Sequence, residues 1–177
     1  AFTEIRRLVG ALSLTYSTRD QACALFDSAQ SEGLIRGRSL EGFAAAAVYA
    51  VCRTNRISRT TAEILEVARA DDAELDAAYD AMNRELGLPT GPIDPREYIP
   101  RFATVPDLPR DVERRADELA AEATETGAAG GRKPSGVAAA CLYAAAQTAN
   151  YPLTQQEAAD VAAVTPVTVR NAYRDVR

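Results

Sequence analysis

The chain has 177 residues, 20 of them lysine or arginine and 25 aspartate or glutamate, and its net charge of −5 argues against strong non-specific binding to nucleic acid. It has no histidine, its three cysteines are not spaced as metal ligands, and no nucleophile motif or phosphate-binding glycine loop is present, so we expect neither enzyme activity nor a bound metal. With 47% hydrophobic residues but no apolar run of about 18 residues, the chain should form packed cores in a reducing cytoplasm and should not span a membrane.

The first half of the chain has the pattern of five helices. The third is predicted from Phe43 to about Arg53 behind a capping serine, Ser39, and because it is apolar nearly all round it should be the buried central helix. A short fourth helix follows Thr60 or Thr61, either of which could cap it. Apolar residues at helical spacing mark the second helix (Ala22, Leu25, Phe26, Ala29) and the fifth (Leu75, Ala78, Tyr79, Met82, Leu86).

A helix-breaking segment, residues 87–95, divides the chain, since it holds three prolines and two glycines. Across this segment the sequence repeats itself at an offset of 94 residues, and 15 of the 47 pairs formed by residues 37–83 are identical. We therefore predict an all-α fold of two tandem five-helix repeats, at residues 1–88 and 95–177, joined by a linker at residues 89–94.

The second repeat copies the helices of the first. Its central helix is predicted from Val137 to about Thr148, and a short helix follows Thr154. Inward-facing stripes mark its second helix (Val112, Ala116, Leu119, Ala123) and its last helix (Val169, Ala172, Tyr173, Val176).

Residues 154–174 have the pattern of a helix-turn-helix, although many helical hairpins look alike. Thr154 and Glu157 form a capping box, a tight turn is expected near Ala163, and Thr165 should cap the second helix with Pro166 at its first position.

One outward face of the last helix favours contact with DNA bases. Val167, Arg170 and Arg174 share this face, because they are spaced i, i+3 and i+7. Arginine can pair with guanine in the major groove, and valine or the Thr168 methyl group can touch a thymine methyl.

The two repeats differ in charge. Residues 1–94 have 14 acidic and 10 basic side chains, whereas residues 95–177 have 11 and 10. The contrast is sharpest in the last helices: residues 71–85 have a net charge of −5 and residues 165–177 a net charge of +2. We expect only the second repeat to enter a DNA groove.

Three segments together resemble transcription initiation factor B, most closely its archaeal branch: residues 35–38 with the helix that follows, residues 131–136 with the helix that follows, and residues 167–174. The resemblance covers nearly the whole chain. It implies two cyclin-like repeats that clamp TATA-binding protein on bent promoter DNA, read the B recognition element upstream of the TATA box and help to recruit RNA polymerase.

The resemblance also assigns individual residues. Those carried over by position are Val167, Thr168, Arg170 and Arg174 at the recognition element, Arg132 and Lys133 at the upstream DNA backbone, Arg36, Gly37 and Arg38 at DNA downstream of the TATA box, and Arg53 at TATA-binding protein.

Two further expectations follow from the resemblance. The zinc ribbon and linker of the family are not within these residues, so the chain should be a core fragment without a cofactor. A cyclin-like module that binds only protein, such as a kinase activator, is the alternative, because cyclin folds serve both roles.

The basic side chains are almost all arginine: the 19 arginines against one lysine fit either a GC-rich genome or adaptation to high salt.

Overall fold

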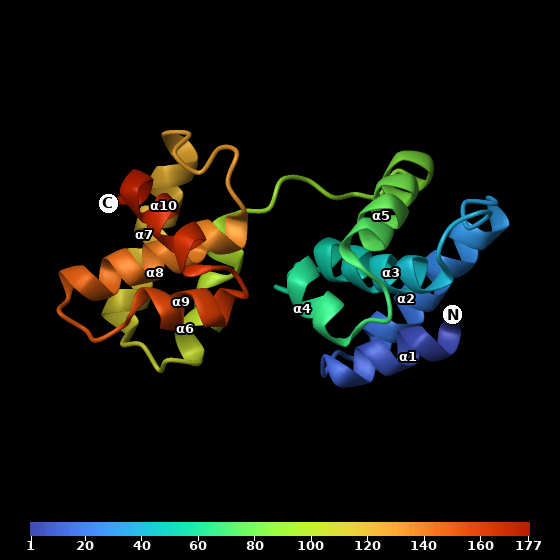
Figure 1. The fold of residues 1–177 in the computed structure, drawn as a ribbon, viewed down its shortest axis with the longest axis horizontal. Helices are drawn as coiled ribbons and strands as arrows, with labels where there is room; N and C mark the ends of the chain where they lie inside the picture. The colour runs from blue at the N-terminus through green and yellow to red at the C-terminus, as the bar shows by residue number, and fades with distance from the viewer. The chain divides into compact units, whose positions relative to one another are not determined.

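The computed structural model describes all residues from 1 to 177 and is entirely helical (Figure 1). It divides into two compact units, residues 1–91 and residues 92–177. The predicted all-α, two-repeat fold is confirmed. No helix is both long enough and apolar enough to cross a membrane.

The first unit is built around its third helix. Its five helices are α1 (Phe2–Ala11), α2 (Tyr16–Ser31), α3 (Leu40–Thr54), α4 (Thr61–Val67) and α5 (Asp72–Leu86). α3 packs against each of the other four. Its N-terminus is capped as predicted, because the Ser39 hydroxyl accepts a hydrogen bond from the Gly42 N–H at 3.0 Å.

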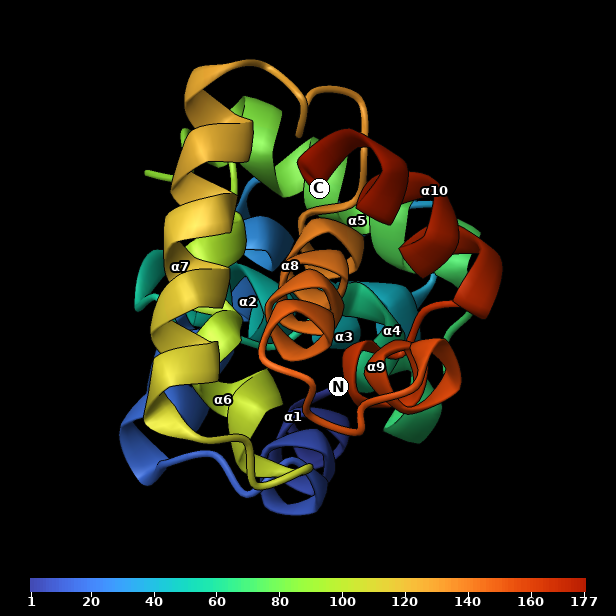
Figure 2. The ribbon, with the colours of Figure 1, turned by 90° about the vertical axis from the view of Figure 1, so that its left-hand side faces the viewer.

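The second unit repeats this plan around α8. Its elements are the short 3₁₀ helix η1 (Pro95–Glu97), α6 (Ile99–Thr104), α7 (Arg110–Glu125), α8 (Pro134–Thr148), α9 (Gln155–Ala162) and α10 (Pro166–Val176). Figure 2 shows α8 between α7 on one side and α9 and α10 on the other, and all three pack against it.

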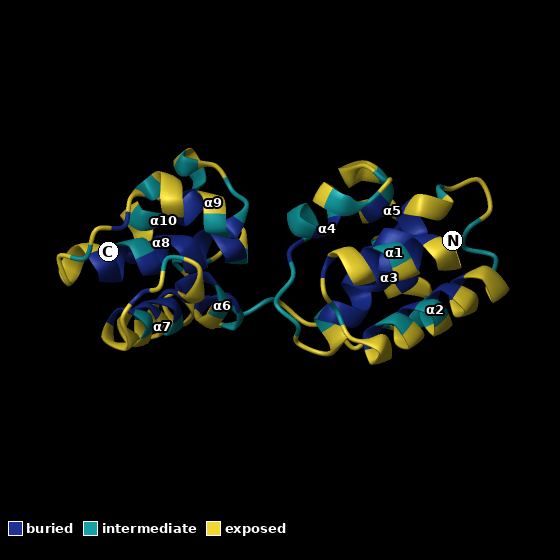
Figure 3. Cartoon of the chain, turned by 90° about the horizontal axis from the view of Figure 1, so that it is seen from below, coloured by how far each residue is buried: buried dark blue, intermediate teal, exposed yellow.

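Both central helices are buried on nearly every side, as predicted (Figure 3). Every residue from 42 to 52 of α3 is buried, and so is every residue from 135 to 146 of α8 except Tyr143. Most of these side chains are alanine or glycine. Small side chains let neighbouring helices approach closely, so the alanine content that dominates the composition is what allows two helices to be surrounded.

Local features recur at the predicted offset of 94 residues. Left-handed backbone conformations pair in this way: Ser13 with Asp107, Gly33 with Gly127, Gly37 with Gly131, and Arg56 with Asn150. An edge-to-face tyrosine pair recurs as well, with ring centroids 5.0 Å apart for Tyr49 and Tyr79 and 5.1 Å for Tyr143 and Tyr173. These shared turns and ring contacts show that the two units have the same local construction.

The segment predicted as a linker divides between the units. Its first part belongs to the first unit, where the Tyr79 hydroxyl donates to the Thr90 hydroxyl at 3.2 Å and Thr90 donates to the Asn83 side chain at 3.2 Å. Its last part belongs to the second unit, where Asp94 caps η1. The segment is therefore bound at both ends to folded structure.

Candidate nucleic-acid interface

α9 is fixed at both ends by local hydrogen bonds. At its start the Thr154 hydroxyl accepts from the Glu157 N–H at 3.1 Å, and the Glu157 carboxylate accepts from the Thr154 N–H at 2.8 Å. The hydrogen bonds from Thr154 hold the pKa of Glu157 below its ordinary value. At its end Ala163 is left-handed, with φ at 53°, and the Val164 N–H donates back to the Ala159 carbonyl at 3.0 Å.

Three residues separate the end of α9 from the start of α10. The Thr165 side chain accepts from the Thr168 N–H at 3.2 Å, and Pro166 is at the first helical position. The predicted helix-turn-helix and its caps are thus confirmed. The first unit lacks the left-handed turn, because Ala68 at the end of α4 is extended and α5 starts only at Asp72.

The two faces of α10 separate as predicted. Val169, Ala172 and Val176 are buried, and Tyr173, which was also predicted to face inward, is half-buried against the same core. α10 packs against α7, α8 and α9. On the other side Val167 has 55% of its surface exposed, and Arg170 and Arg174 are exposed. The exposed face therefore offers one apolar side chain and two guanidinium groups.

Both arginines of this face keep donors available. Arg170 Nε is 3.5 Å from the Gln155 Oε1, which is at the limit of a hydrogen bond. Arg174 has no ion-pair or hydrogen-bond partner. A planar guanidinium with free N–H groups can bind a guanine edge or a phosphate through two hydrogen bonds.

Thr168 differs from its neighbours, because it also supports the fold. It is half-buried, and its hydroxyl lies 3.0 Å from the Thr165 hydroxyl within the cap. Its methyl group packs against α8 so closely that a Cβ on Gly136 would lie 2.8 Å from it. The residue predicted to touch a base is therefore also a contact between α8 and α10.

Beside α10, the first turn of α8 has unsatisfied backbone donors. Lys133 is its N-cap residue and offers no side-chain acceptor, and the N–H groups of Ser135 and Gly136 have no acceptor. A cavity of about 150 Å³ lies here, lined by Gly131, Arg132, Lys133, Gly136, Thr168, Asn171 and Ala172. Free N–H groups, the positive end of the helix dipole and two basic side chains suit an anion.

Arg132, predicted at the DNA backbone, has a partner that the sequence did not suggest. Its Nε donates to the Asp175 Oδ2 at 2.6 Å, and its Nη2 contacts the same oxygen. Asp175 is on the last turn of α10. The signal for it was present, because Asp175 is the only acidic residue among residues 165–177.

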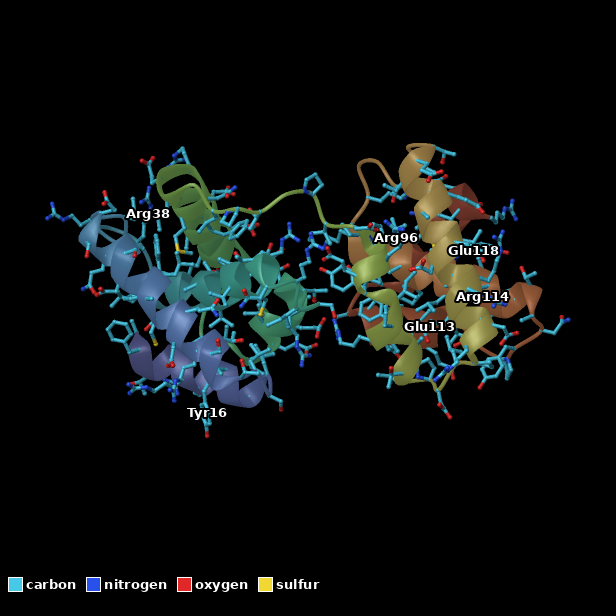
Figure 4. The ribbon with its side chains drawn as sticks, turned by 180° about the vertical axis from the view of Figure 1, so that it is seen from behind. Tyr16, Arg38, Arg96, Glu113, Arg114 and Glu118 are labelled. Atoms are coloured by element: carbon cyan, nitrogen blue, oxygen red, sulfur yellow. The ribbon has the colours of Figure 1, made fainter.

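In the first unit, the predicted site residues of the loop between α2 and α3 are exposed. Arg36, Gly37 and Arg38 lie together there, and Figure 4 shows Arg38 at this loop. Gly37 has a positive φ of 70°, which favours glycine. Arg38 donates from Nη1 to the Leu34 carbonyl at 2.7 Å and so folds back on its own loop.

Arg53, predicted to contact a protein partner, is half-buried at the end of α3. Its Nη2 donates to the carbonyl of Gly91, in the segment that follows α5. One N–H group is therefore used within the first unit, and the other guanidinium donors remain.

The counterpart of α10 in the first unit is acidic. Ala73, Asp76 and Asp80 are exposed on α5 at the positions that correspond to Val167, Arg170 and Arg174. A hollow of about 500 Å³ between α6 and α7 is lined by Ile99, Pro100, Arg110, Glu113, Arg114 and Asp117, of which Glu113 and Arg114 are labelled in Figure 4. Its mixed charge offers no uniform field for a nucleic acid.

No cluster of three or more cysteine or acidic side chains is placed to hold a metal ion.

The fold and the site define a class: all-helical proteins of two cyclin-like repeats, the second carrying a helix-turn-helix with an arginine-bearing exposed face. Comparison with known proteins identifies the family. The sequence profile described as "Transcription factor TFIIB repeat" matches residues 1–85 and again residues 89–177. The chain therefore belongs to the TFIIB family of transcription factors, which is not a family of enzymes.

Individual relatives are archaeal. Transcription initiation factor IIB 1 of Halobacterium salinarum is 58% identical over 99% of this chain and 61% of its own length. Transcription initiation factor IIB 3 of the same organism is 45% identical, and the factor IIB of Methanococcus maripaludis is 44% identical, each over 99% of this chain. The chain spans 61%, 55% and 52% of these three relatives, and the predicted resemblance to the archaeal branch is confirmed.

Proposed function

We propose that this chain is the promoter-binding core of a transcription initiation factor, which joins TATA-binding protein to promoter DNA and helps to recruit RNA polymerase. The observation that carries the proposal is the exposed face of α10, where Val167, Arg170 and Arg174 point away from the core of a helix-turn-helix. This function places the protein with promoter DNA in the cytoplasm of an archaeal cell.

In this proposal α10 reads the B recognition element in the major groove. Arg170 and Arg174 supply the paired N–H donors that discriminate guanine, and the exposed Val167 supplies an apolar contact for a thymine methyl. Thr168 contributes less to base recognition than its neighbours do, since its hydroxyl lies against Thr165 and its methyl group against Gly136.

The start of α8 binds the backbone upstream. A phosphate beside Lys133 would accept hydrogen bonds from the free N–H groups of Ser135 and Gly136, and Arg132 lines the same cavity. The first unit has no such vacancy, because Ser39 already caps Gly42. This difference supports an upstream backbone role for Arg132 and Lys133.

The first unit binds protein and downstream DNA. Arg53 retains guanidinium donors for TATA-binding protein beside the segment it holds at Gly91, and the exposed loop of Arg36, Gly37 and Arg38 reaches DNA downstream of the TATA box. The acidic α5 is repelled by phosphates and stays outside the groove.

Because the second unit is nearly neutral, its affinity for the promoter must come from several contacts at once. Its 10 basic side chains face 11 acidic ones within residues 95–177, so its own attraction to DNA is weak and falls further in high salt. Simultaneous contacts to TATA-binding protein and bent DNA would supply the missing affinity.

The test is a binding titration with promoter fragments that carry single substitutions in the recognition element, with and without TATA-binding protein, at several salt concentrations. We expect Arg170→Ala to lose about 1–3 kcal/mol of discrimination at one base pair, and Arg132→Ala to weaken binding while keeping the discrimination at that base pair. Equal profiles for the two variants, or tight specific binding without the partner, would contradict the proposal. Binding to protein alone would favour the cyclin-like protein module instead.

A further inference from the structure

The segment from Arg132 to Gly136 holds α10 at two points, one near each end of that helix. In the first turn of α10, the Thr168 methyl group packs against Gly136. In the last turn, Asp175 forms an ion pair with Arg132 through its Oδ2. The loop proposed to touch the DNA backbone and the helix proposed to read bases are thereby fastened to each other.

Only the first of these contacts is present in both units. In the first unit, Gly42 packs against Glu74 as Gly136 packs against Thr168, at the offset of 94 residues. The ion pair has no counterpart there, because Ala81 occupies the position of Asp175 and is buried with 1% of its surface exposed. Arg38, at the position of Arg132, donates to its own loop. The ion pair is therefore specific to the unit whose last helix is basic.

We propose that Asp175 is a positioning residue that sets the DNA specificity of this chain, by fixing the last turn of α10 and the neighbouring Arg174 relative to the Arg132 loop. The inference rests on the proposed function. Arg174 has no partner of its own, so the direction of its side chain depends on the placement of the turn that carries it. An unfastened last turn would let Arg174 reach alternative acceptors, including phosphates, which carry no sequence information.

The charge of Asp175 supports a positioning role over a direct one. A carboxylate among the arginines of a DNA-reading helix would be repelled by phosphates if it were unpaired. Pairing with Arg132 offsets that repulsion. Both side chains are partly exposed, at 33% for Arg132 and 38% for Asp175, so the pair lies at the surface, where it joins the helix to the loop.

The experiment measures discrimination at two base pairs, using the full chain with TATA-binding protein and promoter fragments. The base pair read by each arginine is defined by which discrimination is lost in Arg170→Ala and in Arg174→Ala. For Asp175→Asn we expect discrimination to fall about two- to fivefold at the base pair of Arg174, the size expected for a surface ion pair, and to stay unchanged at the base pair of Arg170. Asp175→Glu, which keeps a carboxylate for Arg132, should keep the discrimination of the parent chain at that base pair.

Two further measurements separate this inference from simpler explanations. Asp20→Asn is the matched control, because it also removes one carboxylate paired with an arginine, Arg19, but in the first unit. It should leave both ratios unchanged. Hydrogen exchange of the free chain should show faster exchange at the last turn of α10 in Asp175→Asn and no change in α9.

The outcomes are distinguishable. A uniform change in affinity with both ratios preserved would overturn the inference and leave the proposed function intact. A parent chain without any base discrimination would overturn the proposed function and this inference with it. Unchanged exchange at the last turn of α10 would show that Asp175 does not fix it and would also overturn the inference.

Discussion

Replacing Gly136 by alanine tests how closely α10 is packed against α8. The new Cβ would lie 2.8 Å from the Thr168 Cγ2, a distance at which one of the two groups must move. Overpacking of this kind costs about 1–3 kcal/mol. Alanine is a better helix former than glycine by about 1 kcal/mol, so we expect a net loss of roughly 0–2 kcal/mol in the free energy of unfolding of the second unit.

The repeated structure supplies a matched comparison in Gly42. There the new Cβ would lie 2.8 Å from the backbone oxygen of Glu74 and 3.0 Å from its carbonyl carbon. A backbone group in the first turn of α5 cannot rotate away as a side chain can. Gly42→Ala should therefore cost about 1 kcal/mol more than Gly136→Ala, near the upper end of the overpacking range.

A second substitution identifies the cause. Thr168→Ser removes the methyl group that the new Cβ would meet but keeps the hydroxyl that lies against Thr165. In the Gly136→Ala background it should recover most of the loss, whereas in the Gly42→Ala background it should recover nothing. Hydrogen exchange of the α3 and α8 amides in urea reports the stability of each unit separately. Equal costs at the two glycines, or no rescue by Thr168→Ser, would refute the packing argument.

Two other predictions concern titratable groups. The buried Glu4 accepts hydrogen bonds from Arg7, which lower its pKa from an ordinary 4.5, so its stabilising contribution is complete above pH 4.5 and is lost as the pH falls through the lowered pKa. Glu4→Gln should cost about 1–3 kcal/mol at pH 7 in a urea titration and progressively less in acid, and a cost independent of pH would contradict this. Burial raises the pKa of Cys52 to about 11 and of Cys141 to about 12, so at pH 8 a thiol reagent should modify the half-buried Cys23 first. Equal labelling rates for all three thiols in the folded chain would contradict this assignment.

Features of the structure that depend on short-range patterns could be predicted from the sequence. The caps at Ser39, Thr154 and Thr165 and the turn at Ala163 were predicted because each involves residues within a few positions of one another. The two-repeat organisation was predictable because glycine, arginine and tyrosine matches at one fixed offset are rare by chance. The buried stripe of α10 could be separated from its exposed face because both follow the helical period.

Contacts between distant residues could not be predicted in this way. Arg132 and Asp175 are 43 positions apart, and Arg53 and Gly91 are 38 apart. Neither pair follows from a helical period, because each depends on how the loop before a central helix, or the segment after α5, folds over its unit. Thr168 shows a second kind of limit, since the pattern placed it on the surface while packing against Gly136 gives it a structural role as well.

The differences between the two units lie at equivalent positions, and each of them makes the second unit better suited to bind an anion than the first. Where Ser39 caps α3 with its own oxygen, Lys133 leaves the start of α8 uncapped. Loss of an N-cap costs a helix about 1 kcal/mol, so the second unit gives up stability at the place where an anion would restore it. Exposed acids of α5, Asp76 and Asp80, are replaced in α10 by arginines that have free donors.

These replacements have a common physical consequence. A unit whose central helix is capped by its own serine and whose last helix is acidic offers no comparable site for a phosphate, so the first unit is left to contacts with protein and to one exposed basic loop. A unit with unmet donors and unpaired guanidinium groups gains stability from a polyanion that fits them. On the proposed function, promoter DNA is thus the missing cap and counter-charge of the second unit, and the duplicated fold needs only a few substitutions to divide the two tasks.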